Sequence, residues 1–192
     1  AADPVGWAML NITGGSLPRF APDSPTEWIS KPKLTYGSAP GIMGDLARLR
    51  TAAICWKAEG VTDMLGMLSM PDLPPDVAVV TNSNGCKQQP LKWICELIAG
   101  EGRRPVNVLH DADVPGQRGA TGWDKSGKHR EGWAEGLARV TDEVRNVELP
   151  YPVAETSGKD VRDWLFEGGD YAGLRTLADQ TKVVTASKVI AN

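Results

Sequence analysis

Acidic residues occur in three short groups, each of which follows a segment that we expect to end a strand. The groups are Glu59-Gly60-x-x-Asp63, Asp111-x-Asp113-x-x-Gly116 and Lys159-Asp160-x-x-Asp163. Carboxylates that lie close together raise one another's pKa unless a cation neutralises them. Oxygen ligands without His or Cys favour Mg²⁺ or Mn²⁺ over zinc, and such an ion usually coordinates a phosphate as well. The acidic groups therefore predict metal-dependent chemistry on a phosphate.

The middle group has a spacing that suits one shared cation. Asp111 and Asp113 are two residues apart in chain that we expect to be extended, so their side chains point the same way. Gly60 and Gly116 allow the backbone to turn tightly beside the acids. A structural alternative stays open, in which Asp111 and Asp113 only cap a turn.

Four apolar runs are predicted to be the strands that position these groups, and helical patterns lie between them. The runs cover residues 52–56, 77–80, 106–109 and 144–149, and the helical patterns cover residues 45–50, 62–70, 90–98 and 131–140. Strands that alternate with helices indicate an α/β fold with a parallel sheet flanked by helices. Functional side chains gather beyond the carboxyl ends of such strands. The Gly- and Pro-rich residues 14–44 favour short strands and turns instead.

The composition limits the kind of partner. Of the 192 residues, 41% are hydrophobic and 23% are charged, as in folded globular proteins. The formal net charge of −3 argues against a protein that holds nucleic acid by charge alone, so a phosphate partner requires bound cations or a local basic patch. Cys55, Cys86 and Cys95 have neither disulfide nor zinc-ligand spacing. Without a membrane-spanning run or a recognisable signal peptide, we expect a cytoplasmic protein with no membrane partner.

The three acidic groups, taken in this order and each at the end of its own strand, resemble the toprim domain. This module occurs in bacterial-type primases, topoisomerases, recombination mediators and some nucleases. The resemblance covers about residues 51–168. It implies a Rossmann-like parallel sheet that carries a metal-dependent catalytic site.

A second resemblance narrows the family to primases. Residues 19–28 (RFAPDSPTEW) and 31–37 (KPKLTYG) look like the segment that precedes toprim in primases, and residues 159–165 are similar to phage- and plasmid-type primases and primase-helicases. The resemblance implies synthesis of RNA primers from nucleoside triphosphates on single-stranded DNA in replication, with a replicative helicase as partner. Residues 1–50 would be part of a small, β-rich primase-core subdomain, and residues 169–192 a helical tail.

The resemblance also implies a role for each matching residue. Glu59 would bind a metal ion or accept the proton of the attacking 3′-hydroxyl. Asp111 and Asp113 would hold Mg²⁺ or Mn²⁺ against the nucleotide phosphates, and Lys159 would contact a phosphate directly. The remaining acids would hold a second ion or orient the first; they are Asp63, Asp160 and Asp163.

Residues 117–130 depart from the family pattern, in which a helix follows the second acidic group directly. We expect a polar insertion that either contacts nucleic acid or forms a solvated loop. Its basic residues are Arg118, Lys125, Lys128, His129 and Arg130, with Trp123 among them. His110 is expected to be a packed, hydrogen-bonded neighbour of the acids rather than a ligand. Trp56 and Trp93 are expected in the core.

Other functions stay open at this point. A toprim nuclease would cleave nucleic acid without triphosphates, and a non-catalytic toprim would serve as a DNA-binding or assembly surface. A topoisomerase is disfavoured, because no tyrosine has an evident setting for a nucleophile. Asp160 and Asp163 also have a structural interpretation, since acids in the first turn of a helix favour its dipole.

Overall fold

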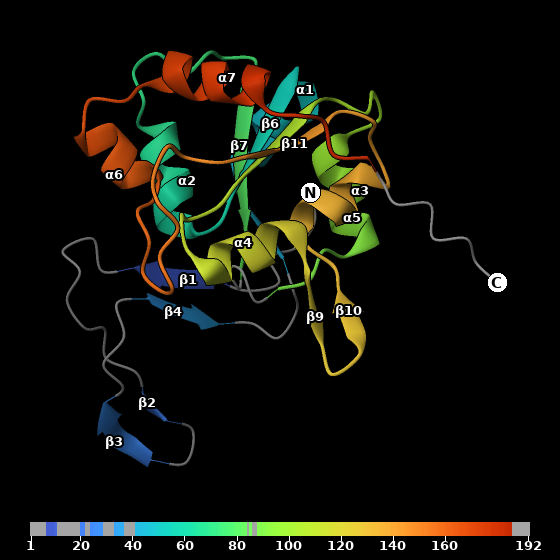
Figure 1. The fold of residues 1–192 in the computed structure, drawn as a ribbon. Coiled ribbons are helices and arrows are strands. Elements are labelled where there is room, and N and C mark those ends of the chain that lie inside the picture. Colours follow the sequence, from blue (N-terminus) through green and yellow to red (C-terminus); the bar gives the residue numbers. More distant parts are fainter. Residues whose placement is uncertain are drawn as a thin grey trace. The chain divides into compact units, whose positions relative to one another are not determined.

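Figure 1 shows a computed structural model of the chain. The structure describes residues 41–83, 85 and 88–185, and before them the strands at residues 7–10, 20–21, 24–28 and 33–36. The chain forms two compact units, Ala1–Gly41 and Ile42–Asn192, which are described separately.

The first unit contains two antiparallel strand pairs. β1 (Trp7–Leu10) pairs with β4 (Lys33–Tyr36), and β2 (Phe20–Ala21) pairs with β3 (Ser24–Trp28). Short strands agree with the Gly- and Pro-rich composition of this part of the chain. Several primase-like positions lie outside the described residues; they are residues 19, 22–23, 31–32 and 37.

The second unit is built on a five-stranded sheet with the order β11-β8-β6-β7-β5. The parallel strands are β6 (Ile54–Ala58), β7 (Val77–Asn82), β8 (Val106–Leu109) and β11 (Val144–Val147). They confirm the predicted apolar runs and the α/β class. β5 (Ile42–Gly44) pairs antiparallel with β7, so the expectation of a wholly parallel sheet is wrong at this edge. Two neighbouring strands must run parallel when a helical crossover joins them. β5 is followed in the chain by β6 and not by its neighbour β7, so this constraint does not apply to the β5–β7 pair.

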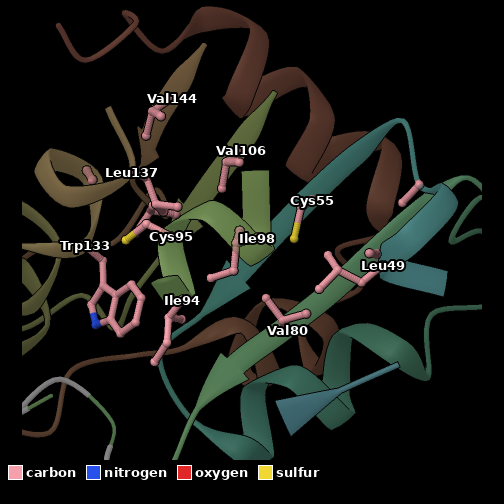
Figure 2. Packing of buried hydrophobic residues seen from close by; sticks show 14 of the residues in the cluster. Leu49, Cys55, Val80, Ile94, Cys95, Ile98, Val106, Trp133, Leu137 and Val144 are labelled. Carbon is pink, nitrogen blue, oxygen red and sulfur yellow. The ribbon is translucent and has the colours of Figure 1, made fainter. Parts of the chain in front are cut away.

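Helices cover both faces of the sheet (Figure 1). One face carries α1 (Leu46–Thr51), α3 (Lys92–Ala99), α4 (Val114–Thr121) and α5 (Trp133–Ala138), and the other carries α2 (Val61–Leu68), α6 (Val161–Phe166) and α7 (Tyr171–Gln180). Figure 2 shows the first of the two hydrophobic clusters, in which Cys55 and Val106 of the sheet pack with Ile94 and Trp133 of the helices. Coverage of both faces explains why the strands are continuously apolar.

The segment of residues 117–130 is not a loop, which was one of the two alternatives for it, and the expected insertion before the next helix is wrong, because α4 follows the second acidic group directly. It begins inside α4, whose N-cap is Asp113 and whose first turn contains Pro115, a position where a missing N–H costs nothing. β9 (Trp123–Lys125) and β10 (Lys128–Arg130) then form an antiparallel hairpin. The hairpin turn is Ser126-Gly127, and both residues have positive φ, at 52° and 73°. Positive φ at both central residues is the geometry that matches the twist of a two-residue hairpin.

Two tryptophans expected in the core have different environments. Trp56 on β6 is fully buried, as predicted, whereas Trp93 is 51% exposed and its predicted burial is wrong. α3 buries the face that carries Ile94, Cys95 and Ile98, and Trp93 lies outside that face. None of the helices in the described part of the chain is long and apolar enough to cross a bilayer.

Candidate metal centre

The carboxylates of Asp63, Asp111 and Asp160 converge at the carboxyl ends of the parallel strands. One oxygen from each lies within 4.8 Å of the other two, so the three residues could hold a metal ion. Asp111 follows β8, Asp63 lies in the first turn of α2, and Asp160 is the N-cap of α6. Asp63 and Asp160 are buried and Asp111 is half-buried. The group therefore combines all three acidic motifs of the sequence, one residue from each.

Backbone hydrogen bonds join the loops that carry these acids. The amide of Ala112 donates to the carbonyl of Lys159 over 2.8 Å, which brings the residue before Asp160 to the residue after Asp111. Gly158 makes this approach possible, because a Cβ at that position would lie 2.1 Å from the carbonyl oxygen of Ala112. The loop before Asp160 therefore packs directly against the loop after Asp111, and a side chain at residue 158 would prevent this.

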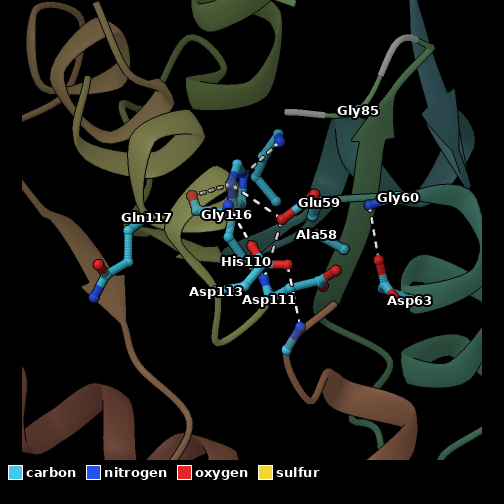
Figure 3. Close-up of polar contacts among 12 residues, drawn as sticks. Ala58, Glu59, Gly60, Asp63, Gly85, His110, Asp111, Asp113, Gly116 and Gln117 are labelled. Atoms are coloured by element: carbon cyan, nitrogen blue, oxygen red, sulfur yellow. Dashed lines mark hydrogen bonds and ion pairs between the residues drawn. The ribbon is translucent and has the colours of Figure 1, made fainter. Parts of the chain in front are cut away.

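One oxygen of Asp63 and one of Asp160 are held by backbone amides. Oδ2 of Asp63 accepts from the amide of Gly60 over 2.9 Å (Figure 3). Oδ1 of Asp160 accepts from the amides of Arg162 and Asp163 over 2.7 and 3.2 Å. The other oxygen of Asp63, Oδ1, is buried and has no hydrogen-bond donor among the described residues. Nε of Arg162 lies 3.4 Å from this oxygen as an ion pair without a hydrogen bond, so the oxygen is an acceptor that a closer cation would satisfy.

The electrostatics of the three acids favour a bound cation. Burial, followed by the charges of Glu59, Asp63 and Asp160, raises the pKa of Asp111 to about 8. Burial and the charge of Asp160 raise the pKa of Asp63 to about 6, against the lowering effect of Arg162. A divalent cation among these oxygens would favour their charged forms. The donor set contains oxygen only, which fits Mg²⁺ or Mn²⁺.

Glu59 supports Asp111 from the end of the neighbouring strand. Its Oε2 accepts from the amide of Asp111 over 3.1 Å and lies 3.6 Å from Nδ1 of His110 (Figure 3). Gly116 packs against the same place, since a Cβ there would lie 2.4 Å from the carbonyl oxygen of Asp111 and 3.0 Å from Oε2 of Glu59. Glu59 and Gly116 therefore fix the backbone that carries Asp111.

The other two predicted ligands bind backbone amides. Asp113 caps α4, with Oδ1 accepting from Gly116 over 2.7 Å, and its Oδ2 accepts from Gly158 over 3.2 Å. Asp163 accepts from the amide of Asp160 over 2.9 Å. The pair that we expected to share a cation, Asp111 and Asp113, is thus not the set that the structure brings together. The spacing of Asp160 and Asp163 is that of a capping box, but Gly60 and Asp63 have the same spacing, so it does not distinguish these roles.

The predicted phosphate-binding residues lie in two places. Lys159 is exposed, forms an ion pair with Glu167, and has its Nζ 4.7 Å from the centre of the Tyr151 ring. The others are exposed on α4 and the hairpin; they are Arg118, Lys125, Lys128 and Arg130. The guanidinium of Arg130 lies 5.8 Å from the Trp123 ring centre.

A buried Lys57–His110 pair lies beneath the site and was missed by sequence reasoning. Lys57 is fully buried on β6, and its Nζ lies 2.8 Å from Nε2 of His110. Nδ1 of His110 lies 3.0 Å from the carbonyl oxygen of Gly116, which can only accept, so Nδ1 carries the proton and Nε2 accepts from Lys57. Burial, followed by the charge of Lys57, lowers the pKa of His110 well below its usual value. His110 is thus the packed, hydrogen-bonded neighbour that was expected. A lysine inside an apolar strand was the signal for its partner.

Comparison with known protein families and with curated proteins finds no match for this chain. Its chemistry must therefore be inferred from the residues of the site.

Proposed function

We propose that this chain is the metal-dependent catalytic part of a DNA primase, which joins ribonucleotides on a single-stranded DNA template. The observation that carries the proposal is the convergence of Asp63, Asp111 and Asp160, with a buried Asp63 oxygen that lacks a donor. The order of the three acidic motifs resembles toprim, and the segments before residue 38 resemble primases. The alternatives are a toprim nuclease and a non-catalytic toprim module.

The proposal assigns one task to the three converging aspartates and another to Glu59. Asp63, Asp111 and Asp160 would hold Mg²⁺ or Mn²⁺, which would neutralise charge on the reacting phosphates. Glu59 holds the amide of Asp111 and is the proposed acceptor of the 3′-hydroxyl proton. A small hollow, lined also by Gln117, Asn146 and Tyr151, leaves space next to Asp111. Lys159 is the proposed phosphate contact at its exposed position.

The experiment for this proposal is an assay of the chain with single-stranded DNA, labelled nucleoside triphosphates and Mg²⁺ or Mn²⁺. The expected product is short RNA that disappears with a chelator and in Asp111→Asn. Shortening of labelled DNA in the absence of triphosphates would favour the nuclease instead. If neither product forms and the chain does not bind the cations, the non-catalytic alternative replaces the proposal.

We further propose that the β9–β10 hairpin contacts the nucleic acid. Lys125, Lys128 and Arg130 are exposed on it. Nε2 and Nδ1 of His129 lie 2.9 and 3.1 Å from carboxylate oxygens of Glu135 and Asp124, and the cationic ring donates to both. These contacts raise the pKa of His129, which favours the cationic form. The eight-residue helix α4 connects Asp113 to the hairpin, a distance of roughly 12 Å along the helix axis. A strand of nucleic acid can span this distance.

The double variant Lys125→Gln/Lys128→Gln is expected to bind single-stranded DNA about tenfold more weakly at low salt. Two lost phosphate contacts should reduce the slope of log affinity against log salt by roughly 1.4. Fluorescence anisotropy over a salt series measures both quantities. Lys92→Gln is the matched control, because Lys92 has an 83% exposed side chain on α3. An unchanged slope in the double variant would remove the hairpin from the interface.

A further inference from the structure

Arg162 lies against the oxygens that a cation would need at the metal centre. Its Nε donates to Oδ2 of Asp160 over 3.0 Å, and its Nη2 contacts the same oxygen. The same Nε lies 3.4 Å from Oδ1 of Asp63. The guanidinium therefore bridges two of the three converging carboxylates.

Of the four carboxylate oxygens of Asp63 and Asp160, two accept hydrogen bonds from backbone amides and two do not. Oδ1 of Asp160 is taken by two α6 amides, and Oδ2 of Asp63 is taken by the amide of Gly60. The remaining oxygens, Oδ2 of Asp160 and Oδ1 of Asp63, both face Arg162. A cation held by both residues would use the oxygens that the guanidinium now contacts. Two positive charges cannot share these positions, so cation and guanidinium must compete.

The exposure of the Arg162 side chain allows it to move away from the carboxylates of Asp63 and Asp160. Its side chain is 54% exposed, whereas the side chains of Asp63 and Asp160 are each 9% exposed. The guanidinium thus lies on the solvent side of two buried carboxylates. Gly66 leaves room for its stem, since a Cβ there would lie 3.3 Å from Cγ of Arg162.

We infer that Arg162 is an exchangeable counter-ion, which the divalent cation displaces from Asp63 and Asp160 and which then binds a phosphate group of the nucleotide that accompanies the cation. The inference rests on the metal centre of the proposed function. A released guanidinium has five donors in a planar fork that matches two phosphate oxygens. The negative charge of the incoming phosphate also replaces the carboxylate that Arg162 has lost.

The variant Arg162→Gln tests two steps separately: the displacement of Arg162 by the cation, and the binding of Arg162 to a phosphate. The variant removes the charge and keeps the backbone amide that donates to Oδ1 of Asp160. Mn²⁺ binding without nucleotide is expected to become roughly tenfold tighter, because the competitor is gone. Binding of a nucleoside triphosphate at saturating Mn²⁺ is expected to become roughly tenfold weaker, because a charge-assisted contact is lost. Electron paramagnetic resonance of free Mn²⁺ and titration calorimetry measure the two affinities.

Arg175→Gln provides the matched control, since Arg175 pairs with Asp179 on α7 outside the metal centre. It should change neither affinity. If the wild-type chain binds no Mn²⁺, the metal centre itself is refuted and the inference falls with it. If the wild type binds Mn²⁺ and Arg162→Gln binds it equally or more weakly, the metal centre stands and the exchange is refuted. A parallel loss of both affinities would likewise refute it, because that is the result of a structural role.

Discussion

Replacing Asp111 by Asn is expected to weaken Mn²⁺ binding by roughly 100-fold or more and to remove metal-dependent activity. Asp111 is the member of the three-carboxylate group that follows strand β8, and the pKa of its half-buried side chain is raised to about 8. Even residues that only support a metal ligand usually contribute ten- to 100-fold to affinity, and a ligand should contribute at least as much. Titration calorimetry with Mn²⁺ measures the change. The matched control is Asp142→Asn, at an exposed aspartate outside the group, which should bind as the wild type does.

The same carboxyl should make the stability of the metal-free chain fall as the pH rises. An unfolded aspartate releases its proton near 3.8, whereas Asp111 in the fold holds it to about 8 and Asp63 to about 6. Between these values the folded state binds more protons than the unfolded state, so the free energy of unfolding decreases with increasing pH. Urea unfolding in a chelator should therefore show a lower midpoint at pH 8 than at pH 5. Asp111→Asn should show a smaller decrease in the midpoint. An equal decrease would mean that the pKa of Asp111 is not raised in the fold.

Gly116→Ala is expected to lower the free energy of unfolding by about 2 kcal/mol and to weaken Mn²⁺ binding. An alanine inside a helix normally stabilises a protein relative to glycine. Here, however, the new Cβ would lie 2.4 Å from the carbonyl oxygen of Asp111 and 3.0 Å from Oε2 of Glu59. Because one of these contacts is backbone, relief requires movement of the loop that carries Asp111. Urea unfolding and Mn²⁺ titration measure the two effects.

Gly102→Ala tests whether the effect belongs to this position. A Cβ at residue 102 would meet no atom within 4 Å, so this variant should be nearly neutral. A Gly116→Ala protein as stable as the wild type, with unchanged Mn²⁺ affinity, would contradict the tight packing of Gly116 against the site.

The sheet was largely predictable because each parallel strand is marked by a run of apolar residues that are consecutive in the sequence. Apolar runs that are covered on both faces identified the four parallel strands, and the helical patterns between them gave the α/β class. The direction of β5 was not predictable, because strand pairing at an edge depends on tertiary packing rather than on the pattern of Ile42–Gly44. The β9–β10 hairpin was missed although Ser126-Gly127 is a turn signal, because its polar strands lack the apolar alternation that identifies a half-buried strand.

At the site, the sequence identified the acids but not how each is used. Asp63, Asp111 and Asp160 converge, while Asp113 and Asp163 accept from backbone amides. Both roles use the same residue type at the end of a strand or the start of a helix, so spacing alone cannot separate them. Arg162 lies two residues beyond Asp160 in the chain, but its contact with Asp63 depends on how α6 packs against α2. Contacts of this kind exist only in the folded chain.

Anomalous diffraction from crystals of the chain grown with Mn²⁺ tests the central claim most directly. A manganese peak is expected between the carboxylates of Asp63, Asp111 and Asp160, with the guanidinium of Arg162 moved away from it. The absence of manganese there, with Arg162 still bound to Asp160, would contradict both the metal centre and the displacement of Arg162.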